Sequence, residues 1–225
     1  MTEAMGFSAA TFSFLRGLAD NNDKTWFDAH RDEFEKHVRQ PFIQALEASA
    51  DATIGAPWEL HGGRGTMFRI NRDVRFATDK SPYKTSVAGL LTPTGDKRES
   101  SGLAYIHLAD GGGFVACGYH QLLPARLTPI RDRIIERADE FTAVLDGLAG
   151  KRRALSDDDS LKAMPRGYSE YADHEHAEHL RRRSFIVSQN LNQKDWVTGG
   201  VVDKVAALVH DCAELVAFVA RADDE

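Results

Sequence analysis

A run of basic residues between positions 64 and 84 is the part of the sequence whose residue types point most directly to chemistry. It holds six Lys and Arg residues against two Asp, a net charge of +4, in a chain whose net charge is −6. Concentrated positive charge attracts anions, and the planar arginine side chain matches the oxygens of carboxylate and phosphate. We therefore expect an anionic ligand to bind among Arg69, Arg72, Asp73, Arg75, Asp79, Lys80, Tyr83 and Lys84.

Within this segment, Arg72, Arg75 and Lys80 are expected to hold the anion. Tyr83 is expected to form a wall of the pocket, and Asp73 to orient one of the arginines. Loops carried by a rigid scaffold are common places for such sites. A structural explanation is equally open, because the two aspartates of the segment can pair with neighbouring cations. Such a network would fix a long loop without any ligand.

Two other classes of function are consistent with the same sequence. A nucleic-acid-binding module would add the basic runs at residues 151–153 and 181–183, with Phe76, Tyr83 and Tyr168 as candidates for base stacking. A scaffold or partner-binding protein would need no small ligand and would present an apolar surface patch. If the anionic ligand is also a substrate, hydrolysis or transfer of a phosphoryl or acyl group is the expected reaction.

Histidines supply the remaining candidates for catalysis and metal binding. His120 follows a predicted strand and is of a residue type that serves as a general base, with Asp73 or Asp79 as the carboxylate that would orient it. A metal site is one interpretation of three nearby histidines, His174, His176 and His179. Only the last two share a helical face, which favours a solvated polar helix turn instead. No serine nucleophile elbow or phosphate-binding loop motif occurs, and no cofactor is indicated.

The elements that must position these residues begin with helices. Ser8 and Asp23 are typical helix N-caps, and apolar residues follow each of them at helical spacing. Pro41 lies within the second pattern, which predicts a kink or a restart of the helix there. The helical signal ends near Gly55, so two or three helices are expected before that residue.

The character of the sequence then changes to strands and back to helices. Residues 66–72 alternate as a strand with one exposed face does, and further strands are expected at 87–91, 103–108 and 114–119, with a short one at 185–187. One long helix is expected over residues 127–148, and a final helix from residue 200. This order predicts an α+β fold, in which a mostly antiparallel sheet of about four to six strands packs against N-terminal, middle and C-terminal helices.

Composition excludes several classes of protein. Hydrophobic residues make up 42% of the 225 residues, which excludes wholesale disorder, and the negative net charge argues against a wholly basic nucleic-acid coat. The two cysteines form neither a disulfide framework nor a metal-knuckle spacing. No stretch is long and apolar enough for a membrane span, and the N-terminus lacks a signal-peptide pattern. A cytoplasmic protein with a single domain over residues 1–225 is expected.

Several motifs resemble the signature of a known family. The most specific are Arg-Asp-Val-Arg-Phe at residues 72–76 and Pro-Tyr-Lys at residues 82–84, with Asn21-Asn22 before them and Pro165-Arg166-Gly167-Tyr168 after them. Together they resemble the conserved family called domain of unknown function 2461 over most of residues 7–219. The resemblance implies a bacterial, cytoplasmic α+β protein. It implies no particular activity and no catalytic residues.

Overall fold

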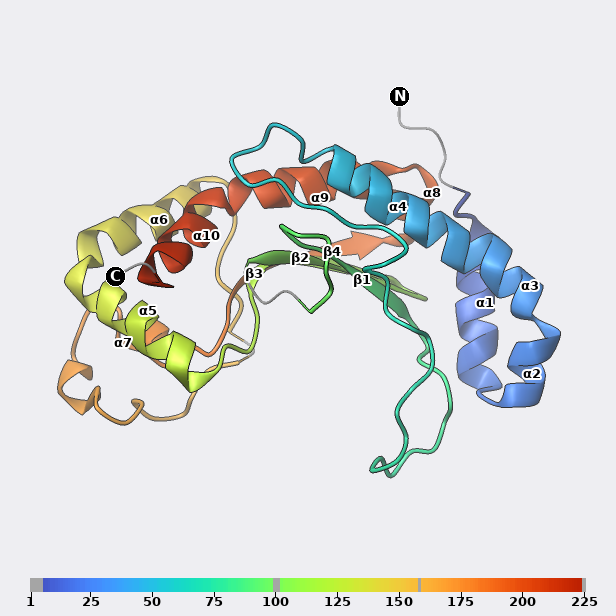
Figure 1. The fold of residues 1–225 in the computed structure, drawn as a ribbon, viewed down its shortest axis with the longest axis horizontal. Helices are drawn as coiled ribbons and strands as arrows, with labels where there is room; N and C mark the ends of the chain where they lie inside the picture. Colours follow the sequence, from blue (N-terminus) through green and yellow to red (C-terminus); the bar gives the residue numbers. More distant parts are fainter. Residues whose placement is uncertain (1–5, 99–101, 158, 224–225) are drawn as a thin grey trace.

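The computed structural model describes residues 6–98, 102–157 and 159–223, and its centre is one antiparallel sheet (Figure 1). The sheet has four strands in the order β1-β2-β3-β4. Their bounds are Val87–Leu91 for β1, Leu103–Ala109 for β2, Gly112–Tyr119 for β3 and Phe185–Asn192 for β4. Helices precede, follow and interrupt the strands, so the expected α+β fold is confirmed.

The N-terminal helices form the arm on the right of Figure 1 and continue over the top of the sheet. Ser8 and Asp23 cap the first two of them, as expected, and the Asp23 carboxylate accepts a hydrogen bond from the amide of Trp26 at 2.9 Å. The bounds are Ala9–Asp20 for α1, Lys24–Ala29 for α2, Arg31–Phe34 for α3 and Gln40–Asp51 for α4, with a π-helical turn at Glu35–Arg39.

Pro41 does not end the helix, because the structure accommodates it in two ways. The π-helical turn lies immediately before α4. In a regular α-helix the carbonyl of His37 would accept a bond from the amide of residue 41, which a proline lacks. The hydroxyl of Thr11, which is 0% exposed, donates to that carbonyl at 2.7 Å instead. The expected kink is therefore a local widening of the helix, tied to α1.

The middle and C-terminal helices are shorter than expected. The helix predicted over residues 127–148 is in fact two helices, because the backbone leaves the helical region at Arg137 (φ −121°, ψ 42°). The final helix is likewise divided, at Cys212. The bounds are Pro124–Glu136 for α5, Ala138–Gly150 for α6, Ala177–Leu180 for α7, Gln193–Val197 for α8, Gly200–Asp211 for α9 and Ala213–Ala220 for α10.

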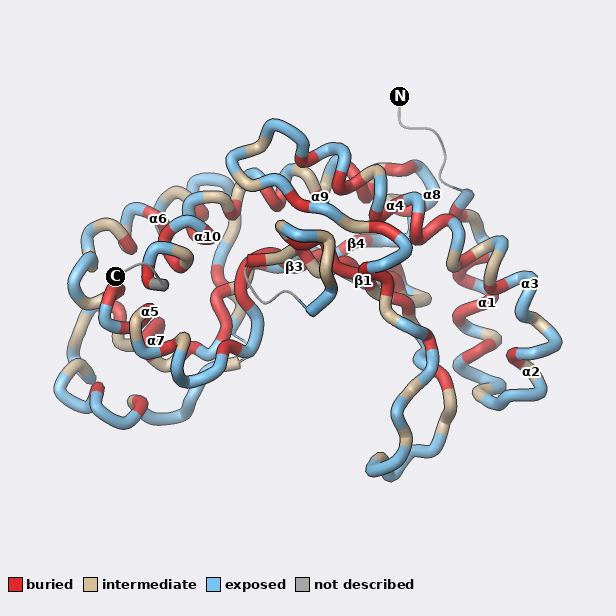
Figure 2. The backbone as a smooth tube through the Cα atoms, viewed as in Figure 1, coloured by how far each residue is buried: buried red, intermediate tan, exposed pale blue. Residues whose placement is uncertain are grey.

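The two faces of the sheet differ in what covers them. On β2, Ala104, Ile106 and Leu108 are 0% exposed, whereas Tyr105 and His107 between them are partly exposed. The buried set faces α4, α8 and α9, which lie over one side of the sheet in Figure 1, and no helix of the described residues forms a layer over the other side (Figure 2). Because side chains alternate along a strand, one face is core and the other is an open surface.

The segment at residues 66–72 is not a regular strand, which corrects the prediction. It makes one isolated bridge to β1, between Met67 and Gly89. A second bridge, between Asn71 and Tyr83, joins the two ends of the loop that follows the segment. The segment thus leaves the edge of the sheet before a continuous ladder forms. Strand β4, by contrast, extends well beyond the predicted residues 185–187. In the described ranges, no helix combines the length and the apolar character that crossing a bilayer requires.

Candidate functional site

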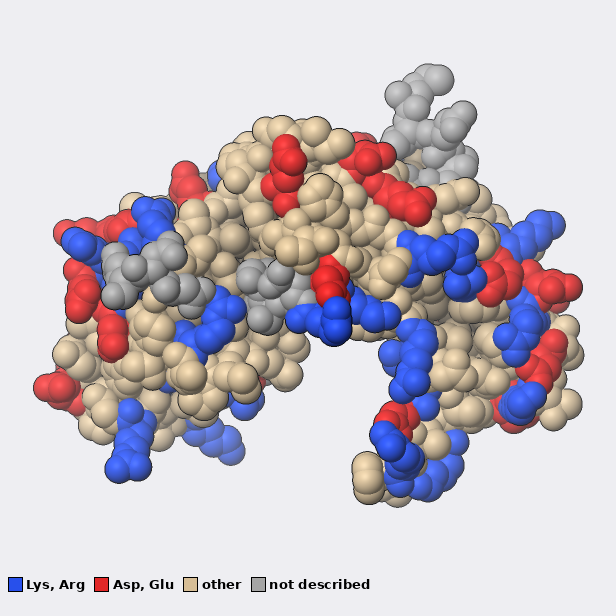
Figure 3. All heavy atoms as spheres, in the orientation of Figure 1, with Lys and Arg blue, Asp and Glu red and all other residues tan. Residues whose placement is uncertain are grey.

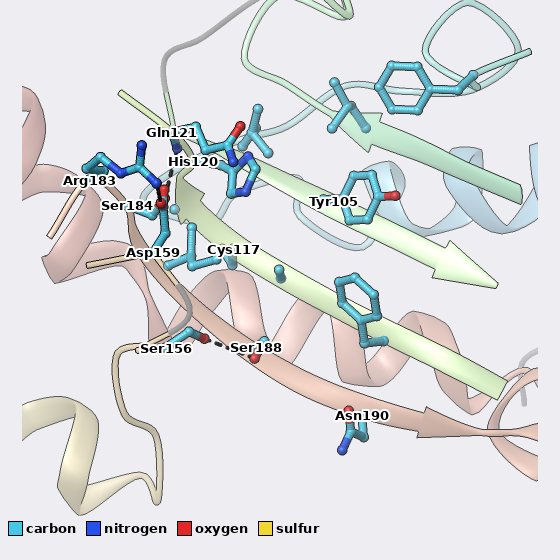
Figure 4. Close-up of a pocket in the computed structure, with 17 residues that line it drawn as sticks. Tyr105, Cys117, His120, Gln121, Ser156, Asp159, Arg183, Ser184, Ser188 and Asn190 are labelled. Carbon is cyan, nitrogen blue, oxygen red and sulfur yellow. Dashed lines mark hydrogen bonds and ion pairs between the residues drawn. The ribbon is translucent and has the colours of Figure 1, made fainter. Parts of the chain in front are cut away.

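A groove of about 950 Å³ lies on the open face of the sheet (Figure 4). Its floor consists of residues on β2, β3 and β4 that point away from the covering helices. Phe68 and Leu90 border it on the β1 side. One end is formed by His120, Gln121, Ser156, Asp159, Arg183 and Ser184. The groove therefore collects side chains from parts of the chain that are far apart in sequence.

Small residues on β3 and β4 leave space on the floor of the groove beside Tyr105. Tyr105 on β2 pairs with Ala116 on β3, which in turn pairs with Ser188 on β4. Gly118, two positions after Ala116, is also on the floor. A Cβ at Gly118 would overlap the carbonyl oxygen of Phe185, and its φ of +126° is one that other residues rarely adopt. Close strand pairing thus requires glycine at this position.

Aromatic rings form one side of the groove. The Tyr105 and Phe114 rings line it with centroids 5.6 Å apart, and His107, which is outside the lining, stacks on Phe114 with centroids 5.0 Å apart. Phe68 adds a fourth ring, 6.4 Å from Tyr105. Burial lowers the pKa of His107 and raises the pKa of Tyr105, so both side chains are neutral at pH 7. This wall offers uncharged aromatic surface to a ligand.

The closed end of the groove is polar and held by hydrogen bonds. The Asp159 carboxylate pairs with the Arg183 guanidinium and accepts a hydrogen bond from the Ser184 hydroxyl at 2.9 Å. The same hydroxyl accepts from the amide of Gln121 at 2.8 Å. Gln121 has a φ of 47°, a costly conformation for a residue other than glycine. Strained backbone of this kind persists where surrounding bonds hold it, and it is common at functional sites.

Most of the predicted anion-binding residues lie on a projecting loop, residues 72–82, which we call the basic finger (Figure 1). Arg72 pairs with Asp79, and Arg75 pairs with Asp73 at 2.7 Å. The Lys80 ammonium donates to a backbone carbonyl of the same loop at 2.9 Å. These contacts are the internal network that the structural explanation anticipated.

The pKa values of the two aspartates reflect these bonds. Hydrogen bonds from Ser81, and then from Arg72, hold the pKa of Asp79 well below its usual value. The Arg75 side chain lowers the pKa of Asp73 in the same way. Both carboxylates stay ionised well below pH 7, so the loop keeps its internal pairs under ordinary conditions.

Arg69 and Lys84, at the base of the finger, are arranged differently. Neither makes a hydrogen bond or ion pair to another side chain within the ranges the structure describes. The Lys84 ammonium lies 5.7 Å from the centre of the Phe68 ring, at the border of the groove. Burial and, secondly, the charge of Arg69 lower the pKa of Lys84. Two neighbouring cations that repel each other are a favourable place for an anion.

Tyr83 lies in the hydrophobic core, which differs from the expected pocket wall. Its ring is 5% exposed and stacks on Phe27, with centroids 4.2 Å apart. The side-chain amide of Asn22 bonds to both backbone groups of Tyr83, each at 3.0 Å. The ring therefore anchors the base of the finger to the N-terminal helices.

His120 lines the closed end of the groove and is exposed, so it remains the candidate base. The carboxylates expected to orient it lie elsewhere, because Asp73 and Asp79 are paired within the finger. Among the described residues that line the groove, the one carboxylate is Asp159. No bond joins it to His120 in this structure.

The cluster of His174, His176 and His179 is largely buried, which corrects the expectation of a solvated turn. His176 is 5% exposed and His179 is 8% exposed, and both rings pack edge-on against Phe141. Burial, followed by the charge of Arg182, lowers the pKa of His179 to about 4. Within the described part of the chain, no group of three potential ligands is arranged to hold a metal ion. The cluster packs the lobe formed by α5 to α7.

The two short basic runs serve different purposes. Arg182 is buried and pairs with Asp157, and Arg153 pairs with Asp211. Arg183 does line the groove. The run at 181–183 can be interpreted from sequence as a solvated face, and this interpretation is wrong for Arg182. Arg183 and Phe68 thus line the same groove, although they are far apart in the sequence.

Sequence reasoning missed the residues that line the floor of the groove. Tyr105, Phe114, Ser188 and Asn190 lie on strands that were predicted wholly or in part, and each lines the groove. The usable signal was alternation, since Tyr105 interrupts a series of buried apolar residues on β2. One aromatic residue on the face opposite the core is common, but a contiguous group of them is typical of an interaction surface.

Comparison with known proteins supports the family resemblance. A family model described as conserved hypothetical protein (DUF2461) matches residues 10–218. The chain belongs to the DUF2461 family. The matched residues run from α1 to α10 and include all of the residues that line the groove in this DUF2461 protein. Comparison with curated proteins and with solved structures returns no match.

Proposed function

We propose that this DUF2461 protein binds an anionic ligand that also carries a flat, apolar group. The flat group lies in the groove against Tyr105 and Phe114, and the anionic group, phosphate or carboxylate, lies at Arg69 and Lys84. The observation that carries the proposal is the position of Lys84, which has no ion pair with any residue that the structure describes and whose ammonium lies over an aromatic ring at the border of the groove.

The form of the groove supports this assignment. Ligand sites are usually concave, mostly apolar and equipped with a few polar groups, and they commonly have volumes of roughly 300 to 1,000 Å³. The groove has about 950 Å³, an aromatic side and a polar end held by Asp159 and Ser184. We therefore assign the anion to the base of the basic segment, at Arg69 and Lys84, rather than to the middle of the segment. The charged residues of the finger pair with one another or with its backbone.

Thermal melting with three probes tests the proposal. The probes are inorganic phosphate, which has charge alone, benzoate, which has a ring and a carboxylate, and thymidine monophosphate, which has a ring and a phosphate. A ligand at a hundred times its Kd adds about 2.7 kcal/mol, which raises the Tm of a protein of this size by about 5 to 10 °C. We expect benzoate or thymidine monophosphate to raise the Tm more than phosphate does.

A matched pair of double variants assigns the effect to the site. Arg69→Ala/Lys84→Ala should remove the ligand-dependent shift. Lys36→Ala/Lys194→Ala removes the same two charges from exposed positions on the outer helices and should leave the shift unchanged. If no probe raises the Tm, or if both double variants lose the shift equally, the proposal is wrong.

A further inference from the structure

We infer that the natural ligand is a single-stranded nucleic acid, which runs from the groove to the tip of the basic finger. This inference rests on the proposed function and names the class of ligand. Three features support it: aromatic rings on the two central strands, basic residues around the hollow beneath the sheet, and an aromatic side chain at the tip of the finger. Each is independent of the others.

The open face of the sheet has the geometry of a base-stacking platform. Tyr105 and Phe114 lie on the neighbouring central strands β2 and β3, with ring centres 5.6 Å apart, and both are partly exposed. Antiparallel four-stranded sheets that bind RNA present aromatic rings on this kind of surface, and two or three unpaired bases stack on them. Asn190, which is exposed, pairs in register with Phe114 and places an amide beside the rings for hydrogen bonds to base edges.

Positive charge lies around this platform, as binding of the anionic phosphates of a nucleic acid requires. Figure 3 shows Lys and Arg atoms along the finger and at the hollow below the sheet, with fewer Asp and Glu atoms among them, whereas charges of both signs lie over the outer helices. The finger has three cations and two carboxylates, a net charge of +1, and Arg69 and Lys84 raise this to +3. A chain with a net charge of −6 thus turns a basic surface toward the groove.

The finger presents a further stacking surface beyond the groove. Phe76 is 97% exposed, and the Arg75 guanidinium lies 6.0 Å from the centre of its ring. The ion pairs and hydrogen bonds within the loop brace it, so that the ring is presented without the entropic cost of ordering a free loop. Phe76 does not line the groove. A mononucleotide in the groove has no contact with it, whereas a longer strand that leaves the groove on this side reaches it.

Fluorescence anisotropy with labelled oligothymidylates of three, six and twelve nucleotides tests the inference, with thymidine monophosphate as a competitor. Affinity should rise with strand length. Phe76→Leu, which keeps an apolar side chain but removes the ring, should weaken the longest strand about fivefold or more. Phe76→Tyr should restore the affinity, and Ile54→Ala, which shortens an apolar side chain that is 70% exposed elsewhere, should have no effect.

Salt dependence and a lipid control complete the test. Two phosphates neutralised by Arg69 and Lys84 predict about a sevenfold loss of affinity between 50 and 200 mM salt, and the double alanine variant should lose this dependence. If thymidine monophosphate binds as tightly as the twelve-nucleotide strand and Phe76→Leu changes neither, the inference is wrong and the proposed function stands. If no nucleotide or oligonucleotide binds but anionic phospholipid vesicles do, the finger is a membrane contact and the inference is overturned. Failure of every anionic probe overturns both.

Discussion

Asp159 controls how much positive charge the groove presents, and Asp159→Asn should therefore tighten anion binding while it weakens the fold. The carboxylate neutralises Arg183, whose side chain is 51% exposed, while that of Asp159 is 12% exposed. In the variant, the amide oxygen still accepts the bond from Ser184. The Arg183 guanidinium loses its ion pair, and the groove gains one unit of positive charge.

The size of both effects follows from the exposure of the pair. Because Arg183 lies at the other end of the groove from Arg69 and Lys84, we take a separation of about 10 Å between its guanidinium and the ligand anion. At that separation the unpaired charge contributes about 0.4 kcal/mol in water, which is about a twofold tighter Kd. The lost pair is partly exposed, so its removal should cost about 1 kcal/mol of unfolding free energy or less, and lower the Tm by about 2 to 4 °C.

Titration of the variant with thymidine monophosphate at low salt measures the first effect, and thermal melting without ligand measures the second. Asp203→Asn is the matched control, because it removes the same charge from an exposed position on α9. The reasoning is refuted if Asp159→Asn leaves the Kd unchanged or weakens it, or if Asp203→Asn tightens it equally. Raising the salt concentration should reduce the gain in affinity for thymidine monophosphate that Asp159→Asn produces.

Three further predictions concern the fold that carries the groove. Gly118→Ala should lower the free energy of unfolding in urea by more than about 1 kcal/mol, whereas Gly111→Ala, where a Cβ meets open space, should change it far less. Thr11→Val should cost about 1 to 3 kcal/mol by leaving the partly buried carbonyl of His37 unpaired, and less in a Pro41→Ala background; equal costs in both backgrounds would contradict the assigned bond. Burial lowers the pKa of His179 to about 4, so between pH 6.5 and 4 the unfolded chain binds a proton at this residue and the folded chain does not. The free energy of unfolding should therefore fall as the pH drops through this range, and His179→Leu should flatten this dependence.

Local signals were sufficient for much of the fold. Ser8 and Asp23 begin their helices as expected, because capping depends on a side chain and on amides within three residues of it. The single helix predicted over residues 127–148 was wrong for a reason that is equally physical. The apolar period continues through Arg137, since α5 and α6 both pack on the core, and neither glycine nor proline marks the break.

The sequence likewise predicted one part of the candidate site and not the other. The basic segment and its internal ion pairs were visible in the sequence, because the partners lie within a few positions of one another. The choice between a structural network and a binding site was not, since it depends on which cations remain unpaired. The fold pairs Arg72 and Arg75 within the finger. It leaves Lys84 over the Phe68 ring at the border of the groove, and the charge of Arg69 is near enough to lower the pKa of Lys84.

The sequence by itself thus determined the α+β class, most of the helices and strands, and the segment with concentrated positive charge. These features follow from periodicity, capping and composition, which act over a few residues. Only the tertiary structure decided that Tyr83 is a core residue and that Phe68, Tyr105, Asp159 and Arg183 share one cavity. Strand register and helix packing bring these residues together, and both are set by the burial of the whole core rather than by any local pattern.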